Sequence, residues 1–190
     1  MKRFLDFIWA FLCLLLFSPL MIVCGLAVWL EDGSPVIFEQ ERIGLYGIPF
    51  NIYKFRSMRV EAEKLGPTML KVDGDKRLTK VGKFLRNHHL DELPQLWNVL
   101  KGDMAFVGPR PERKFFIDKI MEQDARYEQL YQLRPGVTSY ATIHNGYTDT
   151  MDKMLRRLEL DLEYLEHHTL LDDAKILWMT FLNIVMGKKI

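Results

Sequence analysis

The chain has 190 residues and a formal net charge of +1 at pH 7, so no overall electrostatic field would draw it to nucleic acid or to an acidic partner. The length is enough for one domain with a hydrophobic core, and the 48% of hydrophobic residues is ordinary for a globular protein. We therefore expect no nucleic-acid partner, and any anion site must be a local cluster.

The apolar residues are concentrated near the N-terminus. Residues 7–30 carry no charge and, as a helix, would reach across the hydrocarbon core of a bilayer. The run is longer than the centre of a secretory signal peptide, and Glu31 and Asp32 follow it directly, so we expect a retained membrane segment. A helix buried inside a soluble protein is the alternative. Cys13 and Cys24 lie in this run and suit apolar packing, not a metal site or a disulfide.

A Ser-Pro pair lies near the middle of this segment. Pro19 removes a backbone N–H and clashes with the carbonyl of Leu15, which predicts a sharp kink. The hydroxyl of Ser18 can bond back into the previous turn. Lys2 and Arg3 precede the segment, and short positive flanks favour the cytoplasmic side of a membrane. The charges alone allow either a helix that turns back at the Ser-Pro pair or a kinked helix that spans the bilayer.

The next part of the chain predicts a hairpin followed by a capped helix. Residues 35–55 hold two β-rich stretches around a glycine-containing turn. Residues 60–76 are polar and lack a clear period, so we expect a loop. Thr79 is a candidate N-cap for a helix that runs to about Arg86.

The remaining elements are mostly helical. Asp91 is a candidate N-cap for a helix with Pro94 in its first turn, and residues 101–111 form a Gly/Pro-rich loop. The last expected helix is apolar with Trp178 and with lysines beyond its end, which fits either a membrane interface or a core. This last helix is expected at about 174–186, and two others are expected at about 112–131 and 151–168.

Basic residues gather in three segments that glycine and proline shape. Planar arginine side chains on such loops suit the recognition of phosphate oxygens. For any one segment taken alone, a solvated basic face is the alternative. The first basic segment holds Lys76, Arg77, Lys80, Lys83 and Arg86, the second holds Lys101, Arg110 and Arg113, and the third holds Arg134.

Asp91 and Glu92 are adjacent acids that follow the first basic segment. In one interpretation, Asp91 is an ordinary N-cap and Glu92 complements the helix dipole. In the other, the helix N-terminus keeps Asp91 ionised as a nucleophile that attacks phosphorus, and Glu92 holds Mg²⁺ to offset the charge of a diphosphate. The two carboxylates could do both jobs only if the backbone splays them apart.

Residues 90–104 and 107–111 closely resemble the signature of the bacterial sugar transferase family, the small monotopic phosphoglycosyl transferases. Residues 53–58 resemble the earlier basic motif of that family, and residues 134–138 resemble its later one. Ser18 and Pro19 match its helix-break dipeptide. The matches occur in order over nearly the whole chain, so the resemblance is specific.

The resemblance implies an α+β fold, mainly α, in two parts. Residues 1–30 would form a re-entrant membrane helix, and residues 31–190 a cytosolic catalytic domain with a β-hairpin and interfacial amphipathic helices. The site would face the cytoplasm at the bacterial inner membrane and would depend on Mg²⁺. The chain starts at the membrane segment, without the extra helices of the large members, so we expect the minimal form of the family.

The resemblance also implies a reaction. A sugar-1-phosphate would pass from a UDP-sugar to polyprenyl (undecaprenyl) phosphate by a ping-pong mechanism, through an aspartyl phospho-sugar, with release of UMP. By position, Asp91 would be the nucleophile and Glu92 the metal ligand. The other residues that match motif positions are Lys54 and Arg86, which would position the dyad or phosphates, Arg110 and Arg134, which would contact substrate phosphate or nucleotide, and Asp161, in the late acidic motif.

This sequence departs from the family after the later basic motif. Where members commonly have glycine and then glutamine, it has Ser139 and Thr142, which bears on sugar recognition more than on the chemistry. His88 and His89 precede the dyad where small polar residues are common, and without a third ligand we interpret them as surface groups.

The implied reaction would begin the assembly of a capsule, exopolysaccharide, O-antigen or glycoprotein glycan. Downstream glycosyltransferases would then be partners, and the sequence leaves room for a homodimer. Two alternatives to the transferase are open, and only the first of them uses the same carboxylates. A membrane-associated hydrolase of nucleotide-sugars or lipid diphosphates would have water as the final acceptor. A non-catalytic scaffold would not need the acidic and basic motifs together.

Overall fold

The structure, a computed structural model, describes residues 1–60, 77–146, 148 and 150–186. The loop expected at 60–76 lies outside these residues except for its first position, and so do Lys76, Lys188 and Lys189. The described chain is mainly helical, with a β-hairpin and a long apolar helix at its N-terminus, in agreement with the expected fold class.

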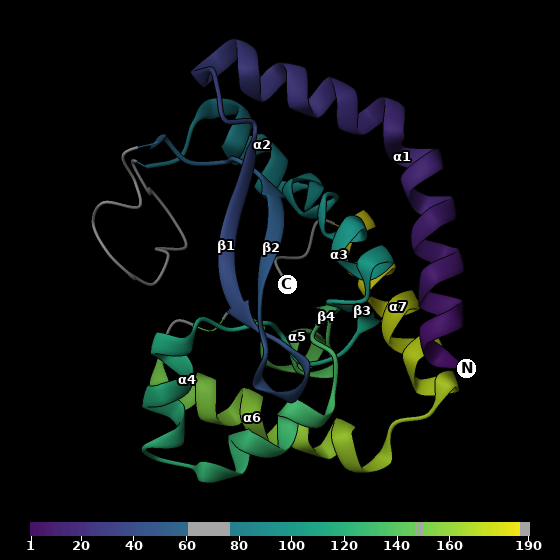
Figure 1. Cartoon of the computed structure of the whole chain (residues 1–190), viewed down its shortest axis with the longest axis vertical. Helices are drawn as coiled ribbons and strands as arrows, with labels where there is room; N and C mark the ends of the chain where they lie inside the picture. The colour runs from purple at the N-terminus through teal and green to yellow at the C-terminus, as the bar shows by residue number, and fades with distance from the viewer. Residues whose placement is uncertain (61–76, 147, 149, 187–190) are drawn as a thin grey trace.

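Helix α1 (Lys2–Asp32) continues through Pro19 as one helix. The hydroxyl of Ser18 donates a hydrogen bond to the carbonyl of Leu15 at 2.8 Å, as expected for the carbonyl that proline leaves without a partner. The ribbon bends part-way along and follows the outside of the molecule (Figure 1). Within the described ranges, α1 is the one helix that is long and apolar enough to cross a membrane.

The outer face of α1 is apolar and exposed. Leu16 and Leu30 are 72% and 75% exposed. The interpretation of this segment as a helix buried inside a soluble protein is therefore wrong for the folded chain. An exposed apolar face of this length is instead suited to a hydrocarbon environment. The buried residues of α1 are Asp6, Ala10, Cys24 and Val28.

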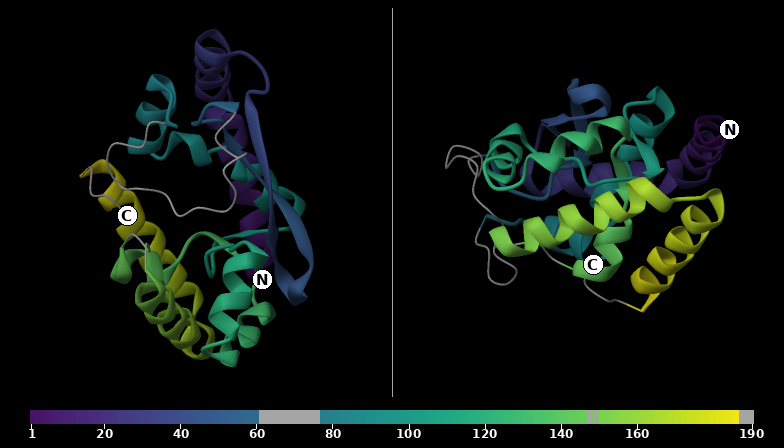
Figure 2. Two further views of the ribbon diagram at one scale, coloured as in Figure 1. Left: turned by 90° about the vertical axis from the view of Figure 1, so that its left-hand side faces the viewer. Right: turned by 90° about the horizontal axis from the view of Figure 1, so that it is seen from below.

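Lys2 and Arg3 fasten the N-terminal end of α1 to the rest of the molecule. The ammonium of Lys2 forms an ion pair with Asp173 and donates to the hydroxyl of Tyr164 at 3.1 Å. The guanidinium of Arg3 donates to two carbonyls in the last turn of α3 (Gln95–Lys101), at 2.5 and 2.7 Å. The N-terminus accordingly lies beside the start of α7 in two views (Figures 1 and 2).

The C-terminal end of α1 is fastened to the same domain. The carboxylate of Glu31 accepts hydrogen bonds from the backbone N–H groups of Lys80 and Val81, both at 2.7 Å. Asp32 pairs with the guanidinium of Arg56 at 3.1 Å. Both ends of the helix are therefore held by residues that come later in the chain.

The predicted hairpin at 35–55 is confirmed. Strands β1 (Ile37–Ile43) and β2 (Pro49–Phe55) pair antiparallel, joined by the 3-10 turn η1 (Leu45–Gly47). Phe38 is opposite Lys54 in the register. The hairpin runs through the centre of the molecule (Figure 1) and places Lys54 near the dyad.

Helix α2 (Lys80–Asn87) begins where the sequence predicts it. The hydroxyl oxygen of Thr79 accepts the backbone N–H of Gly82 at 2.8 Å, which satisfies one of the free donors of the first turn. The 3-10 turn η3 (Leu90–Glu92) follows and leads into α3.

The loop expected at 101–111 contains a short strand that sequence patterning did not predict. Strand β3 (Ala105–Val107) pairs in parallel with β4 (Gly136–Thr138). The two chains approach so closely that a Cβ on Gly136 would lie 2.2 Å from the backbone nitrogen of Gly108. Only glycine fits this crossing, which holds the second and third basic segments together.

The prediction of one continuous helix at 112–131 is wrong, because this segment forms two separate elements. Helix α4 (Lys114–Met121) ends before Asp124, and the 3-10 helix η4 (Ala125–Gln132) follows. The carboxylate of Asp124 accepts the backbone N–H of Arg126 at 2.9 Å, which starts a new turn and breaks the first helix.

The C-terminal half is helical. Helix α6 (Met151–His167) matches the prediction at 151–168, while α5 (Tyr140–Asn145) was not predicted. Helix α7 (Leu170–Val185) begins earlier than expected because Thr169 and Asp172 form a capping box. The main core cluster joins α4, η4 and α6 and includes Ile117, Ile120, Leu130, Leu158 and Leu162.

Helix α7 is not a core helix. Its residues Leu171 and Trp178 are 74% and 62% exposed, and among its described side chains Ile176 is the buried hydrophobic one. This exposure favours the interfacial interpretation of the segment.

Candidate active site

Asp91 lies in the 3-10 turn η3, between α2 and α3, and its side chain is buried. The prediction that Asp91 caps the following helix is wrong: the N-cap of α3 is Pro94. His89, the residue before η3, is in the left-handed conformation (φ 55°). The left-handed residue turns the chain sharply after α2. The carboxyl group is thereby carried into the interior and does not cap a helix.

The environment of Asp91 also differs from the expected one. Burial raises the pKa of its carboxyl, and the negative charge of Glu92 raises it further. The cations Lys54 and Arg86 act in the opposite direction. The ionised form of Asp91 is therefore supported by neighbouring cations, and the helix dipole that the sequence suggested does not lower its pKa below the usual range.

Glu92 is the carboxyl of the pair whose pKa is lowered. Burial alone would raise its pKa, but the charges of Lys54 and Arg110 and a hydrogen bond from Lys54 lower it to about 2. The ammonium of Lys54 lies 2.5 Å from Oε1 of Glu92. The adjacent carboxyls thus have pKa values shifted in opposite directions, an arrangement that is common at catalytic sites.

Asn98 aligns the hairpin with the dyad, a role that sequence reasoning missed. Its fully buried amide accepts the backbone N–H of Tyr53 at 3.0 Å and donates to the carbonyl of Asn51 at 2.7 Å. These bonds fix β2 against α3 and so place Lys54 opposite Glu92. The motif contained Asn98, but its role depends on the position of a strand more than forty residues away.

Arg110 lies between the dyad and a second charged cluster. Its positive charge lowers the pKa of Glu92, and its Nε is 4.0 Å from Glu112. Glu112 also forms ion pairs with Arg157 at 2.7 Å and with Arg42 at 3.8 Å. Glu112, Arg42 and Arg157 were not predicted, because no local pattern marks them.

Asp161 belongs to this second cluster. It is 3% exposed in α6, and its Oδ1 has no hydrogen-bond partner. Burial raises its pKa to about 7, although the charge of Arg157 lowers it. The structure places Asp161 near Glu112, with Arg110 as the link to the dyad.

Arg134 is held at the crossing of β3 and β4. Its Nε donates to the carbonyl of Gly102 at 2.9 Å, just after α3. This bond joins the second and third basic segments. Its contact with nucleotide stays a prediction.

The sequence matches the family described as bacterial sugar transferase over residues 1–187. The chain belongs to this family. It is 43% identical over 182 residues to the UDP-glucose:undecaprenyl-phosphate glucose-1-phosphate transferase of Escherichia coli, over 95% of this chain and 39% of that protein.

Two other relatives extend the comparison. The chain is 39% identical over 186 residues to the UDP-N-acetylgalactosamine-undecaprenyl-phosphate N-acetylgalactosaminephosphotransferase of Aeromonas hydrophila, over 98% of this chain and 44% of that protein. It is 36% identical over 190 residues to the uncharacterized sugar transferase EpsL of Bacillus subtilis, over 100% of this chain and 90% of that protein. The chain thus spans less than half of the first two named relatives and most of the third.

The two departures from the sugar transferase motif have a local structural role. The hydroxyl oxygen of Ser139 accepts the backbone N–H of Thr142 at 2.8 Å and so caps α5. The two hydroxyl groups also bond to each other at 2.8 Å. Ser139 and Thr142 therefore shape the start of α5.

The acidic pair offers carboxylate oxygens, which are the ligand type that a magnesium ion takes. Among the described residues no group of three or more His, Cys, Asp or Glu side chains could hold a metal on its own. Mg²⁺ in phosphoryl-transfer sites commonly uses one or two carboxylates, with substrate phosphates and water as the other ligands. Glu92, with a pKa of about 2, supplies an ionised carboxylate beside Asp91.

Proposed function

We propose that this protein transfers a sugar-1-phosphate from a UDP-sugar to undecaprenyl phosphate or a similar polyprenyl phosphate. The observation that carries the proposal is the buried carboxyl of Asp91 beside ionised Glu92, with Lys54, Arg86 and Arg110 acting on the pair. Family membership and the names of the relatives support the donor and the acceptor.

The reaction has two balanced steps. A carboxylate oxygen of Asp91 attacks the phosphorus that carries the sugar; the bond from that phosphorus to the bridging oxygen breaks, and UMP leaves with the electron pair. An oxygen of the acceptor phosphate then attacks the same phosphorus. The bond to Asp91 breaks, which regenerates the carboxylate and gives polyprenyl-diphospho-sugar.

The surrounding residues prepare Asp91 for this chemistry. Lys54 and Arg86 stabilise its ionised form against burial. Arg110 is placed to bind phosphate oxygens, because its side chain is 46% exposed while its charge reaches Glu92. Glu92 would hold Mg²⁺, which would supply positive charge to the diphosphate. Burial of Asp91 limits the access of water to an acyl-phosphate, which favours transfer over hydrolysis.

We also propose that α1 enters and leaves the membrane on the cytoplasmic face. Lys2 pairs with Asp173 at one end of the helix, and Asp32 pairs with Arg56 at the other. A helix that spanned the bilayer would separate one of these pairs by the hydrocarbon thickness, about 30 Å. A UDP-sugar arrives from the cytosol, so the domain that binds both ends would lie there.

The test of the proposed function is an assay for the covalent intermediate. Protein in nanodiscs is incubated with a mixture of UDP-sugars and Mg²⁺ without lipid acceptor, and peptides are analysed by mass spectrometry. We expect a phospho-sugar adduct on the peptide that contains Asp91, and no adduct in Asp91→Asn. The exposed substitution Asp118→Asn, in α4, is the matched control and should form the adduct.

The same assay separates the alternatives. Steady release of UMP without lipid and without an adduct would favour the hydrolase. An adduct that survives in Asp91→Asn would refute the assignment of the nucleophile. Unchanged UMP release in the presence of a chelator would refute the proposed role of Mg²⁺.

A further inference from the structure

An apolar groove of about 390 Å³ lies between the second half of α1 and α2. Its volume falls in the range of about 300–1,000 Å³ that small-molecule sites occupy. Val23 and Ala27 form the wall on α1, and Val81 and Phe84 form the wall on α2. Eight of its nine lining residues are apolar, and the exception is Lys80.

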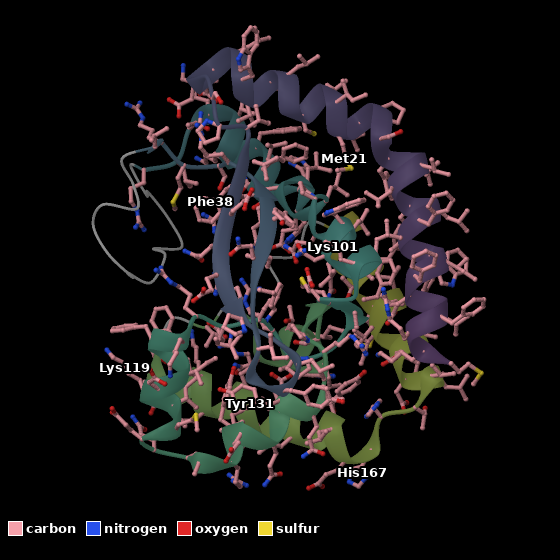
Figure 3. All side chains as sticks on the ribbon, in the orientation of Figure 1. Met21, Phe38, Lys101, Lys119, Tyr131 and His167 are labelled. Atoms are coloured by element: carbon pink, nitrogen blue, oxygen red, sulfur yellow. The ribbon has the colours of Figure 1, made fainter. Side chains whose placement is uncertain are left out.

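The groove is open to the surroundings of α1. Val23 and Phe84 are 62% and 55% exposed, although both walls are hydrocarbon. Figure 3 shows side chains projecting outward along the same helix. Met21, labelled there, packs against the core cluster beneath the groove. Because α1 is the candidate membrane helix, an occupant could enter sideways from lipid without crossing water.

One part of the groove is lined by η3, the turn that carries Asp91. Leu90 lines the groove and is followed directly in the chain by Asp91. Lys80 lies on the groove, and the positive charge of Arg86, from the last turn of the same helix, acts on Asp91. An occupant with a long hydrocarbon chain and a terminal phosphate therefore matches the apolar lining of the groove and the positive charge of Arg86 near Asp91.

We infer that this groove binds the first isoprene units of the polyprenyl phosphate acceptor and so directs its phosphate to Asp91. The inference rests on the proposed function and adds a binding site for the lipid chain. A site that joins an apolar groove to a cationic end favours a lipid phosphate over free phosphate, which lacks the hydrocarbon chain, and over a free polyprenol, which lacks the phosphate.

The test fills the groove and measures the two half-reactions separately. Ala27→Trp places a large side chain in the groove, whereas Leu26→Trp makes the same change one residue earlier, at an exposed position that does not line it. In a ping-pong reaction, kcat/KM for each substrate reports only its own half-reaction. For Ala27→Trp we expect kcat/KM for undecaprenyl phosphate to fall about tenfold or more, with kcat/KM for UDP-sugar and the UMP burst without lipid unchanged.

The outcomes distinguish this inference from the proposed function. If kcat/KM for the acceptor is equal in wild type and both variants, or falls equally in both variants, the inference about the groove fails and the proposed function stands. Absence of the UMP burst and adduct in wild type would overturn the proposed function and the groove with it. If Ala27→Trp fails to fold, Phe84→Ala serves instead, because it removes an exposed side chain that lines the groove. This variant should lower kcat/KM for undecaprenyl phosphate and leave the UMP burst intact.

A second measurement identifies the occupant. Undecaprenol, which has the chain but no phosphate, should compete with undecaprenyl phosphate in wild type and lose that effect in Ala27→Trp. If ordinary phospholipid chains fill the groove instead, undecaprenol at the same mole fraction will not inhibit wild type, and the inference fails.

Discussion

Asp161→Asn should make the protein more stable at pH 8 than the wild type. Burial raises the pKa of Asp161 to about 7, and an unfolded chain would have a value of about 3.9. Because the folded pKa is the higher one, its contribution to stability is full below about pH 4 and is lost as the pH rises to about 7. The loss is about 4 kcal/mol, from a shift of about three pKa units.

The pH dependence is the sharper part of this prediction. Between pH 5 and pH 7 the wild type should lose about 2 kcal/mol that the uncharged variant keeps. For a chain of this size that corresponds to a difference in Tm that grows by roughly 5–10 °C. The amide of the variant meets the same unpaired environment at both pH values, so its own desolvation cost cancels in the comparison.

The assay is thermal unfolding in one detergent at pH 5, 6, 7 and 8. Asp118→Asn removes a carboxylate from an exposed position on α4 and should show no such growth in the Tm difference. A Tm difference for Asp161→Asn that stays constant with pH would refute the reasoning, because it would mean that the folded and unfolded carboxyl groups titrate together. Unchanged transferase activity in the same variant would remove Asp161 from the substrate-binding set.

Three further predictions concern the pKa of Asp91, the hydrogen bonds of Asn98 and the topology of helix α1. Arg86→Gln removes a charge that lowers the pKa of Asp91, so the pH midpoint of adduct formation should move upward, whereas Lys83→Gln should leave it in place. Asn98→Ala removes two partly buried hydrogen bonds to the backbone of β2 and should cost about 0.5–1.5 kcal/mol for each, measured by chemical denaturation, with lower kcat/KM for UDP-sugar. Protease added to inside-out vesicles should remove an N-terminal tag; protection of that tag would contradict the re-entrant topology.

Local signals account for what the sequence predicted well. Thr79 is a side-chain cap at the start of α2, and its partner is only three residues away. The hydrogen bond from Ser18 to Leu15 follows from the proline that comes next. The hairpin at 35–55 combines β-rich stretches with glycine at the turn. In each case the deciding contact lies within a few residues, so the pattern contains it.

The parts that the sequence did not predict depend on distant contacts. Strands β3 and β4 have three residues each, too few for a period, and pair across about thirty positions. The burial that raises the pKa of Asp91 comes from packing around η3, whereas a cap was expected from the Asp-Glu pair followed by proline. Glu112 gathers its arginines from β1 and α6, and no spacing in the chain marks that cluster.

Helix α3 connects α1, the candidate membrane helix, to the dyad, which ties membrane attachment to catalysis in the proposed function. Helix α3 begins just after Glu92, and its last turn accepts the guanidinium of Arg3 at the other end. Asn98, in the middle of α3, holds the strand that carries Lys54. Release of the N-terminus from α3 would therefore disturb the helix that aligns Lys54 with Glu92. Arg3→Gln should lower kcat/KM for UDP-sugar even in detergent, where no bilayer is needed to hold α1; an unchanged value would show that α3 is positioned without that contact.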